Sequence, residues 1–165
     1  MIRIFCFIIC SLFLFLQSPP QKDWRGLSPL TSTRKDVERL LGPPDVNQQN
    51  QLLVYYQTDQ VVYIGFSGNP ECQQKLSYTS WNVPLDTVTG IRIGLRKSVP
   101  LADLGVDLTK LKKRTGDFDR PNHFYYLNEE NGFSAEVGND YVVAYLYEPT
   151  NRQNHLRCQS NQQVR

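Results

Sequence analysis

The sequence contains little histidine and no large excess of charge of either sign. Its 165 residues include 2 histidines, 18 lysines and arginines, and 16 acidic residues, which gives a formal net charge of +2. Domains that bind nucleic acid usually carry a clustered basic surface and a strongly positive balance, so we expect no nucleic-acid partner. The length fits one domain, or two small domains that share a core.

The motifs that hold metals, nucleotides or catalytic nucleophiles are also missing. His123 and His155 have no second histidine or cysteine at a metal-ligand spacing. His123 could be a hydrolase base or a metal ligand, but we favour a solvated histidine at the start of a strand. Gly90 and Gly94 lie in a strand pattern that no helix follows, so they form no phosphate loop. We therefore predict no cofactor, no metal site and no enzymatic activity.

Residues 1–20 have the pattern of an export signal. Arg3 precedes an apolar run, residues 4–16, which is shorter than the ~20 residues that a membrane-spanning helix needs. No A-x-A cleavage triplet follows, so the segment is either a signal peptide or an uncleaved N-terminal anchor. In both cases we expect the rest of the chain to be extracytoplasmic, periplasmic or secreted, with membrane contact only through residues 1–20.

The cysteines are few and unevenly placed. Cys6 and Cys10 belong to the N-terminal segment, which leaves Cys72 and Cys158 for the exported part. A pair of cysteines in an oxidising compartment predicts one disulfide. Two free thiols are the alternative, and no CxxC motif indicates a redox or metal role.

The stretch at residues 27–66 organises the first half of the chain. Thr33 and Asp36 form a capping-box pattern, which predicts the start of a helix. Gly42 and the two prolines after it predict its end. One stripe of this helix is apolar: Val37, Leu40 and Leu41.

Strand patterns follow the helix. Residues 52–57 and 60–67 are rich in Val, Tyr, Ile and Phe and are separated by a short turn, which predicts a hairpin. Residues 87–95 predict a third strand, in which Ile91, Ile93 and Leu95 face one way and Arg92 and Arg96 face the other.

From Val99 onward the same order is repeated. Leucines spaced for a helix occupy residues 101–111, with Asp107 as a candidate cap after the break at Gly105. Three further strands are predicted, at residues 123–128, 132–137 and 141–148.

This repetition predicts an α+β fold. We expect two tandem helix-strand-strand-strand modules, residues 21–98 and 99–150, that form antiparallel sheet with the helices packed on one face. Residues 151–165 are polar and rich in Gln and Asn, and we expect disorder beyond Cys158.

A tyrosine-rich face is the leading candidate for a binding surface. In the last strand the tyrosines alternate with aliphatic residues, and Tyr63 alternates in the same way in the second strand. If the aliphatic side packs on the helices, the tyrosines remain for recognition; ordinary cross-strand pairing is the alternative. Trp81 lies in the long connection at residues 67–86, where a plug over the sheet is the favoured interpretation. The candidate protein-binding residues are Tyr63, Trp81, Tyr141, Tyr145 and Tyr147.

One basic run, Lys110–Arg114, could meet acidic lipid or the carboxylates of a partner. Such a run is more often the solvated end of a helix, where positive charge also suits the helix dipole, and we favour that interpretation.

The string STRKDVERLLGPPD at residues 32–45, followed by a tyrosine-rich hairpin, resembles a helix-plus-hairpin module of small exported bacterial proteins. Members include the small lipoprotein of the outer-membrane β-barrel assembly machine and the β-lactamase-inhibitor protein, which has two such modules in tandem. The WNVP stretch at residues 81–84, with Cys72 before it and the LRC ending at residues 156–158, is similar to uncharacterised exported bacterial proteins.

These patterns together predict the kind of function. We expect an exported bacterial protein that binds another protein, in the envelope or outside the cell, through the tyrosine-rich sheet face. An envelope or outer-membrane assembly or maintenance accessory, anchored near the membrane, is the alternative. A hydrolase-type enzyme is the third possibility, and the sequence does not define an oligomeric state.

Overall fold

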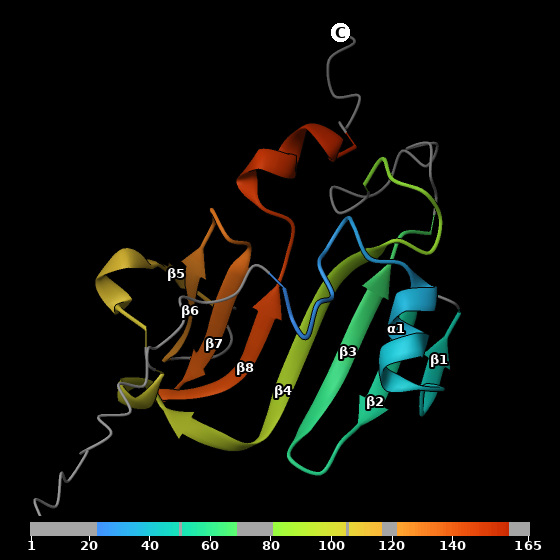
Figure 1. Cartoon of the computed structure of the whole chain (residues 1–165). Helices are drawn as coiled ribbons and strands as arrows, with labels where there is room; N and C mark the ends of the chain where they lie inside the picture. The colour runs from blue at the N-terminus through green and yellow to red at the C-terminus, as the bar shows by residue number, and fades with distance from the viewer. Residues whose placement is uncertain (1–22, 50, 69–80, 105, 117–121, 159–165) are drawn as a thin grey trace, which may run out of the picture.

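The computed structural model describes residues 23–49, 51–68, 81–104, 106–116 and 122–158. These residues form an eight-stranded antiparallel sheet with the strand order β1-β2-β3-β4-β8-β7-β6-β5 (Figure 1). The elements in chain order are α1 (Arg34–Leu41), β1 (Val46–Gln48), β2 (Leu52–Tyr56), β3 (Gln60–Phe66), β4 (Val88–Pro100), η1 (Leu101–Asp103), η2 (Leu108–Lys110), β5 (Lys112–Thr115), β6 (His123–Asn128), β7 (Phe133–Gly138), β8 (Tyr141–Tyr147) and η3 (Asn151–Leu156).

Helix α1 begins and ends where the sequence predicts. The Asp36 carboxylate accepts from the Thr33 backbone N–H at 2.9 Å, and the Asp36 N–H donates to the Thr33 hydroxyl at 3.4 Å, which completes the capping box. Gly42 ends the helix with φ +78°, a conformation that glycine adopts at little cost. The predicted hairpin is confirmed as β2 and β3, and the predicted third strand is confirmed as the start of β4, which continues to Pro100.

The second half of the chain differs from the prediction. Residues 101–111 contain two short 3-10 helices, η1 and η2, in place of a second amphipathic helix. Asp107 does cap η2, because its carboxylate accepts from the Thr109 N–H at 3.1 Å. The leucine stripe is interrupted at Gly105, and glycine disfavours helix continuation. The fold is therefore α+β and dominated by its sheet, and the prediction of two tandem helix-strand modules is wrong.

The basic run is also placed differently from the prediction. Residues 112–115 form the edge strand β5, which pairs with β6 and whose residues are all exposed. Lys113 lies over the rings of Phe124, at 3.7 Å, and Tyr126, at 5.7 Å. The predicted helix end is therefore a charged sheet edge, a common device against unwanted strand pairing.

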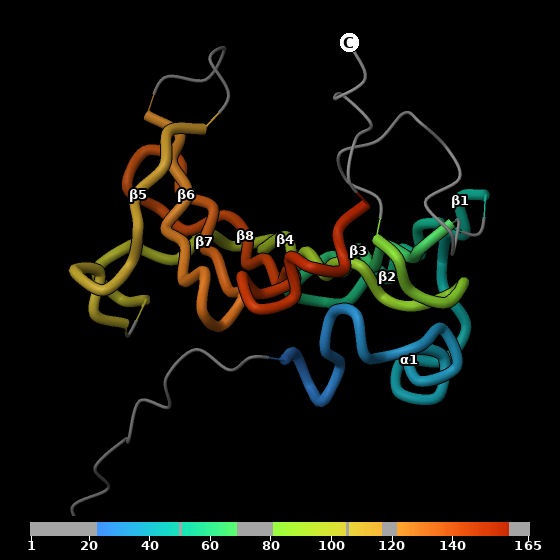
Figure 2. Tube along the Cα trace, turned by 90° about the horizontal axis from the view of Figure 1, so that it is seen from above, coloured from blue at the N-terminus to red at the C-terminus, as the bar shows by residue number. Residues whose placement is uncertain are grey.

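The sheet has two different faces. Figure 2 shows α1 and the segment before it on one side of the sheet, which we call the covered face. Residues opposite each other in antiparallel strands share a face. Val62 on β3 is opposite Ile93 on β4, and Ile93 is opposite Tyr145 on β8, so all three side chains lie on the covered face. The covered face holds two clusters of buried side chains, one under α1 and one on β7 and β8. We call the opposite side the far face.

The C-terminal segment is ordered up to the limit of the described residues. Residues 151–156 form η3, whose start is capped by the side chains of Thr150 and Gln153. Arg157 pairs with Trp81 in an isolated bridge and stacks on its ring at 5.0 Å. The disorder predicted beyond Cys158 concerns residues 159–165, which lie outside the described part of the chain.

Candidate functional site

The far face contains a glycine-floored hollow. Gly65 of β3 and Gly90 of β4 lie directly opposite each other, and the next pair on this face is Tyr63 with Arg92. Because neither glycine has a side chain, the backbone forms the floor of an open depression of about 380 Å³. Its lining residues are Leu52, Tyr63, Gly65, Gly90, Ile91, Arg92, Leu146, Tyr147 and Glu148.

Packing within the fold does not require glycine at position 90. Among the described residues, a Cβ atom there would meet only the backbone oxygen of Tyr147, at 3.7 Å, which is ordinary van der Waals contact. The φ angle of Gly90 lies outside the left-handed region that favours glycine. A glycine inside a strand weakens it and often marks a place where a ligand or another backbone approaches closely. The floor therefore has the geometry of a contact surface, at some cost to strand stability.

Arg92 is held in place at the edge of this hollow. Its Nε and Nη2 atoms donate to Oε2 of Glu136 on β7, at 3.2 and 2.9 Å. The other Glu136 oxygen lies 3.0 Å from Nε2 of His123 on β6. The side chains of Glu136 and His123 are each only 7% exposed, whereas that of Arg92 is 41% exposed. A buried acid and histidine thus orient a cation that remains accessible to solvent.

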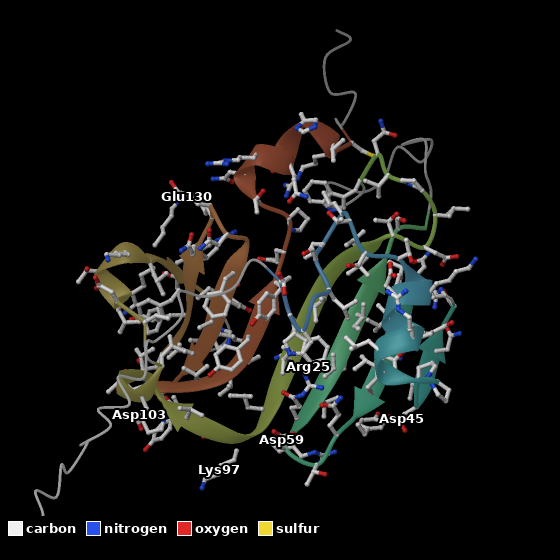
Figure 3. All side chains as sticks on the ribbon, viewed as in Figure 1. Arg25, Asp45, Asp59, Lys97, Asp103 and Glu130 are labelled. Carbon is white, nitrogen blue, oxygen red and sulfur yellow. The ribbon has the colours of Figure 1, made fainter. Side chains whose placement is uncertain are left out.

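The trio of Arg92, Glu136 and His123 contrasts with the charged groups at the rim of the molecule. In Figure 3, Asp45, Asp59, Lys97, Asp103 and Glu130 lie around the edge of the molecule, and all five are exposed. Charged side chains are rarely buried unless they are paired. The trio is paired, but it still interrupts what could be an apolar sheet face.

A second hollow lies beside the first. It is an open depression of about 690 Å³ lined by Arg114, Thr115, Gly116, Tyr125, Leu127, Ser134, Leu146 and Glu148. Leu146 and Glu148 line both hollows, so the two hollows adjoin on the far face, and we call them together the groove. Glu148 is exposed as a whole residue, but partial loss of water around its carboxyl raises the pKa of that group, while the charges of Arg114 and Arg157 act in the opposite direction.

The predicted tyrosine face does not exist as one surface. Tyr63 lies on the far face, in the hollow, and beneath Arg92, whose Cζ atom is 5.7 Å from its ring. Tyr145 and Tyr147 point to the covered face, where they pack against both buried clusters and where burial raises the pKa of each hydroxyl. Their rings contact Phe133, with centroids 6.0 and 5.6 Å away.

A bulge in β8 explains part of this error. Ala144 pairs with Glu136, but Val142 pairs with Val137, so Val143 is an extra residue in the strand. An extra residue reverses the alternation of side chains, so Tyr141 does not continue the row of Tyr145 and Tyr147. Tyr141 is 47% exposed at the start of β8.

Trp81 is buried, with 6% of its surface exposed. Its bridge and ring contact with Arg157 fasten the C-terminal segment to the loop that precedes β4. This agrees with the favoured interpretation of a plug, and it leaves little of the ring for a partner.

Only one of the two cysteines of the predicted disulfide lies in the described part of the chain. Cys158 is a disulfide-bonded cysteine, whereas Cys72 lies outside the described residues. The pairing of Cys72 with Cys158 therefore stays a prediction.

The expectation of a solvated His123 is wrong, because the ring is buried and bonded to Glu136. A ring contact with Tyr125 at 5.2 Å and the close approach of Gly116, where a Cβ atom would collide with the imidazole, enclose it further. Its Nδ1 atom has no hydrogen-bond partner within the described chain. Neither His123 nor Glu136 is among the described residues that line the two hollows, and a general base must reach the substrate's proton directly or through one water.

Three further observations concern metal binding, membrane crossing and the second histidine. Within the described ranges, no group of three or more His, Cys, Asp or Glu side chains is placed to hold a metal ion. The same part of the chain has no helix of the length and hydropathy that crossing a bilayer requires. His155 is exposed, with Nδ1 2.9 Å from the Arg152 carbonyl oxygen.

The sequence interpretation missed the residues that shape the groove. Gly90 and Arg92 were recognised only as strand residues, and Glu136 was not considered. Two signals were present: a glycine in the interior of a strand, and charged residues within strand patterns at positions 92 and 136. Neither signal identifies its partner across the sheet.

No protein-family model and no curated protein matches the chain. Among solved structures, the chain is similar to a DUF4309 family protein (YjgB) from Bacillus subtilis subsp. subtilis str. 168. The identity is 16%, the TM-score is 0.50, and the match covers 77% of this chain and 84% of that protein. At this identity the likeness concerns the fold alone, and the resemblance to helix-plus-hairpin modules stays a prediction.

Proposed function

We propose that this protein binds another protein, without catalysis, through the groove on its far face. The observation that carries the proposal is the pair of opposed strand glycines, Gly65 and Gly90, which leaves an open depression of about 380 Å³ beside Tyr63 and Arg92. The strand would tolerate a side chain at position 90, so the space is better explained by an occupant than by internal packing.

The shape of the groove favours a protein partner over a small molecule. Sites for small ligands usually bury 70–90% or more of the ligand surface. Both hollows here are open depressions, which suit side chains that project from a partner's surface. Tyrosine and arginine, which line both hollows, are enriched among the residues that dominate binding energy at protein interfaces.

The test is affinity capture with the full chain, compared with two variants of Gly90. Gly90→Ala adds one methyl group to the floor and Gly90→Val adds a branched side chain, so a partner held by the parent should be weakened by the first and lost with the second. Gly138→Ala is the matched control, because Gly138 is also a strand glycine, lines neither hollow, and has room for a Cβ atom at 4.0 Å from its neighbours.

Stability measurements separate blocked binding from unfolding. Replacing a strand glycine by alanine should raise the free energy of unfolding by about 0.4–1 kcal/mol where the backbone conformation suits both residues. Gly90→Ala should therefore bind the partner more weakly than the parent and have a higher free energy of unfolding. A partner that Gly90→Val retains at full strength would contradict the proposal.

We also propose that the described part of the chain is extracytoplasmic and that Cys158 pairs with Cys72. A disulfide-bonded cysteine supports this, since disulfides persist in oxidising compartments. Peptide mapping of the full chain under non-reducing conditions should recover residues 72 and 158 in one cross-linked fragment. A link from Cys158 to Cys6 or Cys10 would contradict the pairing.

A further inference from the structure

We infer that the partner presents a carboxylate side chain to Arg92, beside an apolar side chain that rests on the floor formed by Gly65 and Gly90. This inference rests on the proposed function and specifies the chemistry of the segment that occupies the groove. It is carried by the orientation of the Arg92 guanidinium and by the residues that surround its free edge.

The guanidinium of Arg92 is only partly occupied. An arginine has five N–H donors in a planar fork. Two of them, on Nε and Nη2, donate to a single oxygen of Glu136. Among the described residues, the Arg92 side chain makes these two hydrogen bonds alone. The Nη1 edge keeps its donors, on a side chain that is 41% exposed.

Glu136 is not free to turn toward that edge. Its second oxygen is 3.0 Å from His123, and its side chain is 7% exposed. The acid therefore acts as a fixed support on one side of Arg92. A carboxylate from a partner can use the opposite edge, where charge-assisted and paired N–H···O contacts are strong.

A third glycine keeps that edge clear. Gly94 lies two residues after Arg92 in β4 and so shares the far face. A Cβ atom at position 94 would lie 3.3 Å from Nη1 of Arg92 and 3.8 Å from the Tyr63 ring. A side chain there would crowd the guanidinium edge, whereas glycine leaves it accessible.

The floor beside Arg92 favours an apolar neighbour for the carboxylate. Leu52, Leu146 and Tyr63 line the hollow around the two glycines. A partner segment that carries an acidic residue close to an aliphatic or aromatic residue would satisfy both parts. Among the described residues that line the groove, Arg114 in the adjoining hollow is a second cation, and it is the competing site for the carboxylate.

The experiment is selection of binders from a random peptide library displayed on phage, with the full chain as target. Clones are kept only if they bind the parent and Gly138→Ala but not Gly90→Val, so that every retained peptide needs the open floor. We expect these peptides to be enriched in Asp or Glu next to an aliphatic or aromatic residue.

The role of Arg92 is then tested without breaking its contact to Glu136. Replacing the peptide's Asp or Glu by Asn or Gln should weaken binding about tenfold, because hydrogen bonds to charged groups are stronger than those between neutral groups, and a tenfold change corresponds to about 1.4 kcal/mol. Gly94→Ala, which crowds the Nη1 edge, should weaken the acidic peptide more than its amide counterpart and so reduce the ratio between them. Arg114→Gln should leave the ratio between the two peptides unchanged.

The outcomes distinguish the inference from the proposed function. Floor-dependent peptides without acidic enrichment, or a preference for acid that Arg114→Gln abolishes and Gly94→Ala does not, would overturn the inference and leave the binding groove intact. A failure to find any floor-dependent peptide would count against both. Acidic peptides whose preference is lost only in Gly94→Ala would support both.

Discussion

The covered face and the far face of the sheet are formed by the same strands, but their side chains differ in size, polarity and burial. On the covered face, Val62, Ile64 and Ile93 are almost completely buried under α1 and the segment before it. On the far face, the same strands carry Gly65, Gly90 and Arg92. Neighbouring residues of one strand therefore serve dense packing on one side and an open groove on the other.

The difference indicates where stability has been given up. Strand glycines cost conformational entropy, and a buried charge needs partners to compensate for its lost hydration. Positions that break the rules of local stability tend to cluster at functional sites. The covered face obeys these rules and the far face does not, so mutations should affect the two faces in different ways.

The largest expected effect is on the covered face. Ile93→Ala removes buried methyl groups and leaves a cavity, which should lower the free energy of unfolding by about 2–5 kcal/mol. Leu146→Ala on the far face, where the side chain is half-buried beside the groove, should cost less than half of that. Denaturant unfolding of both variants checks the comparison, and equal losses would show that the far face is also packed as a core.

The next effect concerns the buried acid of the far face. Glu136→Gln removes the charge that Arg92 and His123 contact, and should cost about 1.5–3 kcal/mol, the usual range for hydrogen bonds to charged groups. Glu129→Gln is the matched control, because Glu129 lies in the turn before β7 and pairs with Lys112 at the surface. Little change for Glu136→Gln in denaturant unfolding would mean that the trio does not support the far face.

A smaller effect is expected at the cap of the covering helix. Thr33→Ala should lower the free energy of unfolding by about 1 kcal/mol, since it removes a hydroxyl that caps α1. Thr31→Ala, at an exposed position before the cap, is the control.

The cap also predicts a pH dependence. Hydrogen bonds from the Thr33 backbone and hydroxyl lower the pKa of Asp36 in the folded state. Stability from this carboxylate is therefore present above the ordinary pKa of aspartate and is lost as the pH falls through the lowered value. The cost of Thr33→Ala should shrink in that acidic range, and a cost that is constant with pH would contradict this account.

Local sequence signals predicted most of the first half. The cap at Thr33, the stop at Gly42 and the hairpin at residues 52–66 depend on residues close together in the chain, and all three are confirmed. The helix predicted at residues 101–111 is replaced by two short 3-10 helices, because the spacing of the leucines alone does not overcome a central glycine.

The site depends on contacts that no local pattern contains. Arg92 and Glu136 are 44 residues apart in the chain. Their side chains meet because β8 pairs with both β4 and β7 and so places these two strands near each other in the sheet. The faces of Tyr145 and Tyr147 follow from the register of β8 on β4, and a shift of one residue reverses every side chain. Alternation within a strand was predictable, but which side faces the helix was not.

The smallest expected effect is a pH-dependent change in melting temperature on replacing Glu148, a residue of the far face. Glu148 lines both hollows, and desolvation raises its pKa in the folded state. A group of this kind favours folding while it is protonated, at pH values below the ordinary pKa of glutamate, and this contribution is lost as the pH rises through the raised folded value. Glu148→Gln should therefore raise the melting temperature at neutral pH, with the gain disappearing in acid. Glu130→Gln, at an exposed turn, controls for the loss of one negative charge. If Glu148→Gln instead lowers the melting temperature at neutral pH, the carboxylate stabilises the groove and the far face has given up less stability than its glycines indicate.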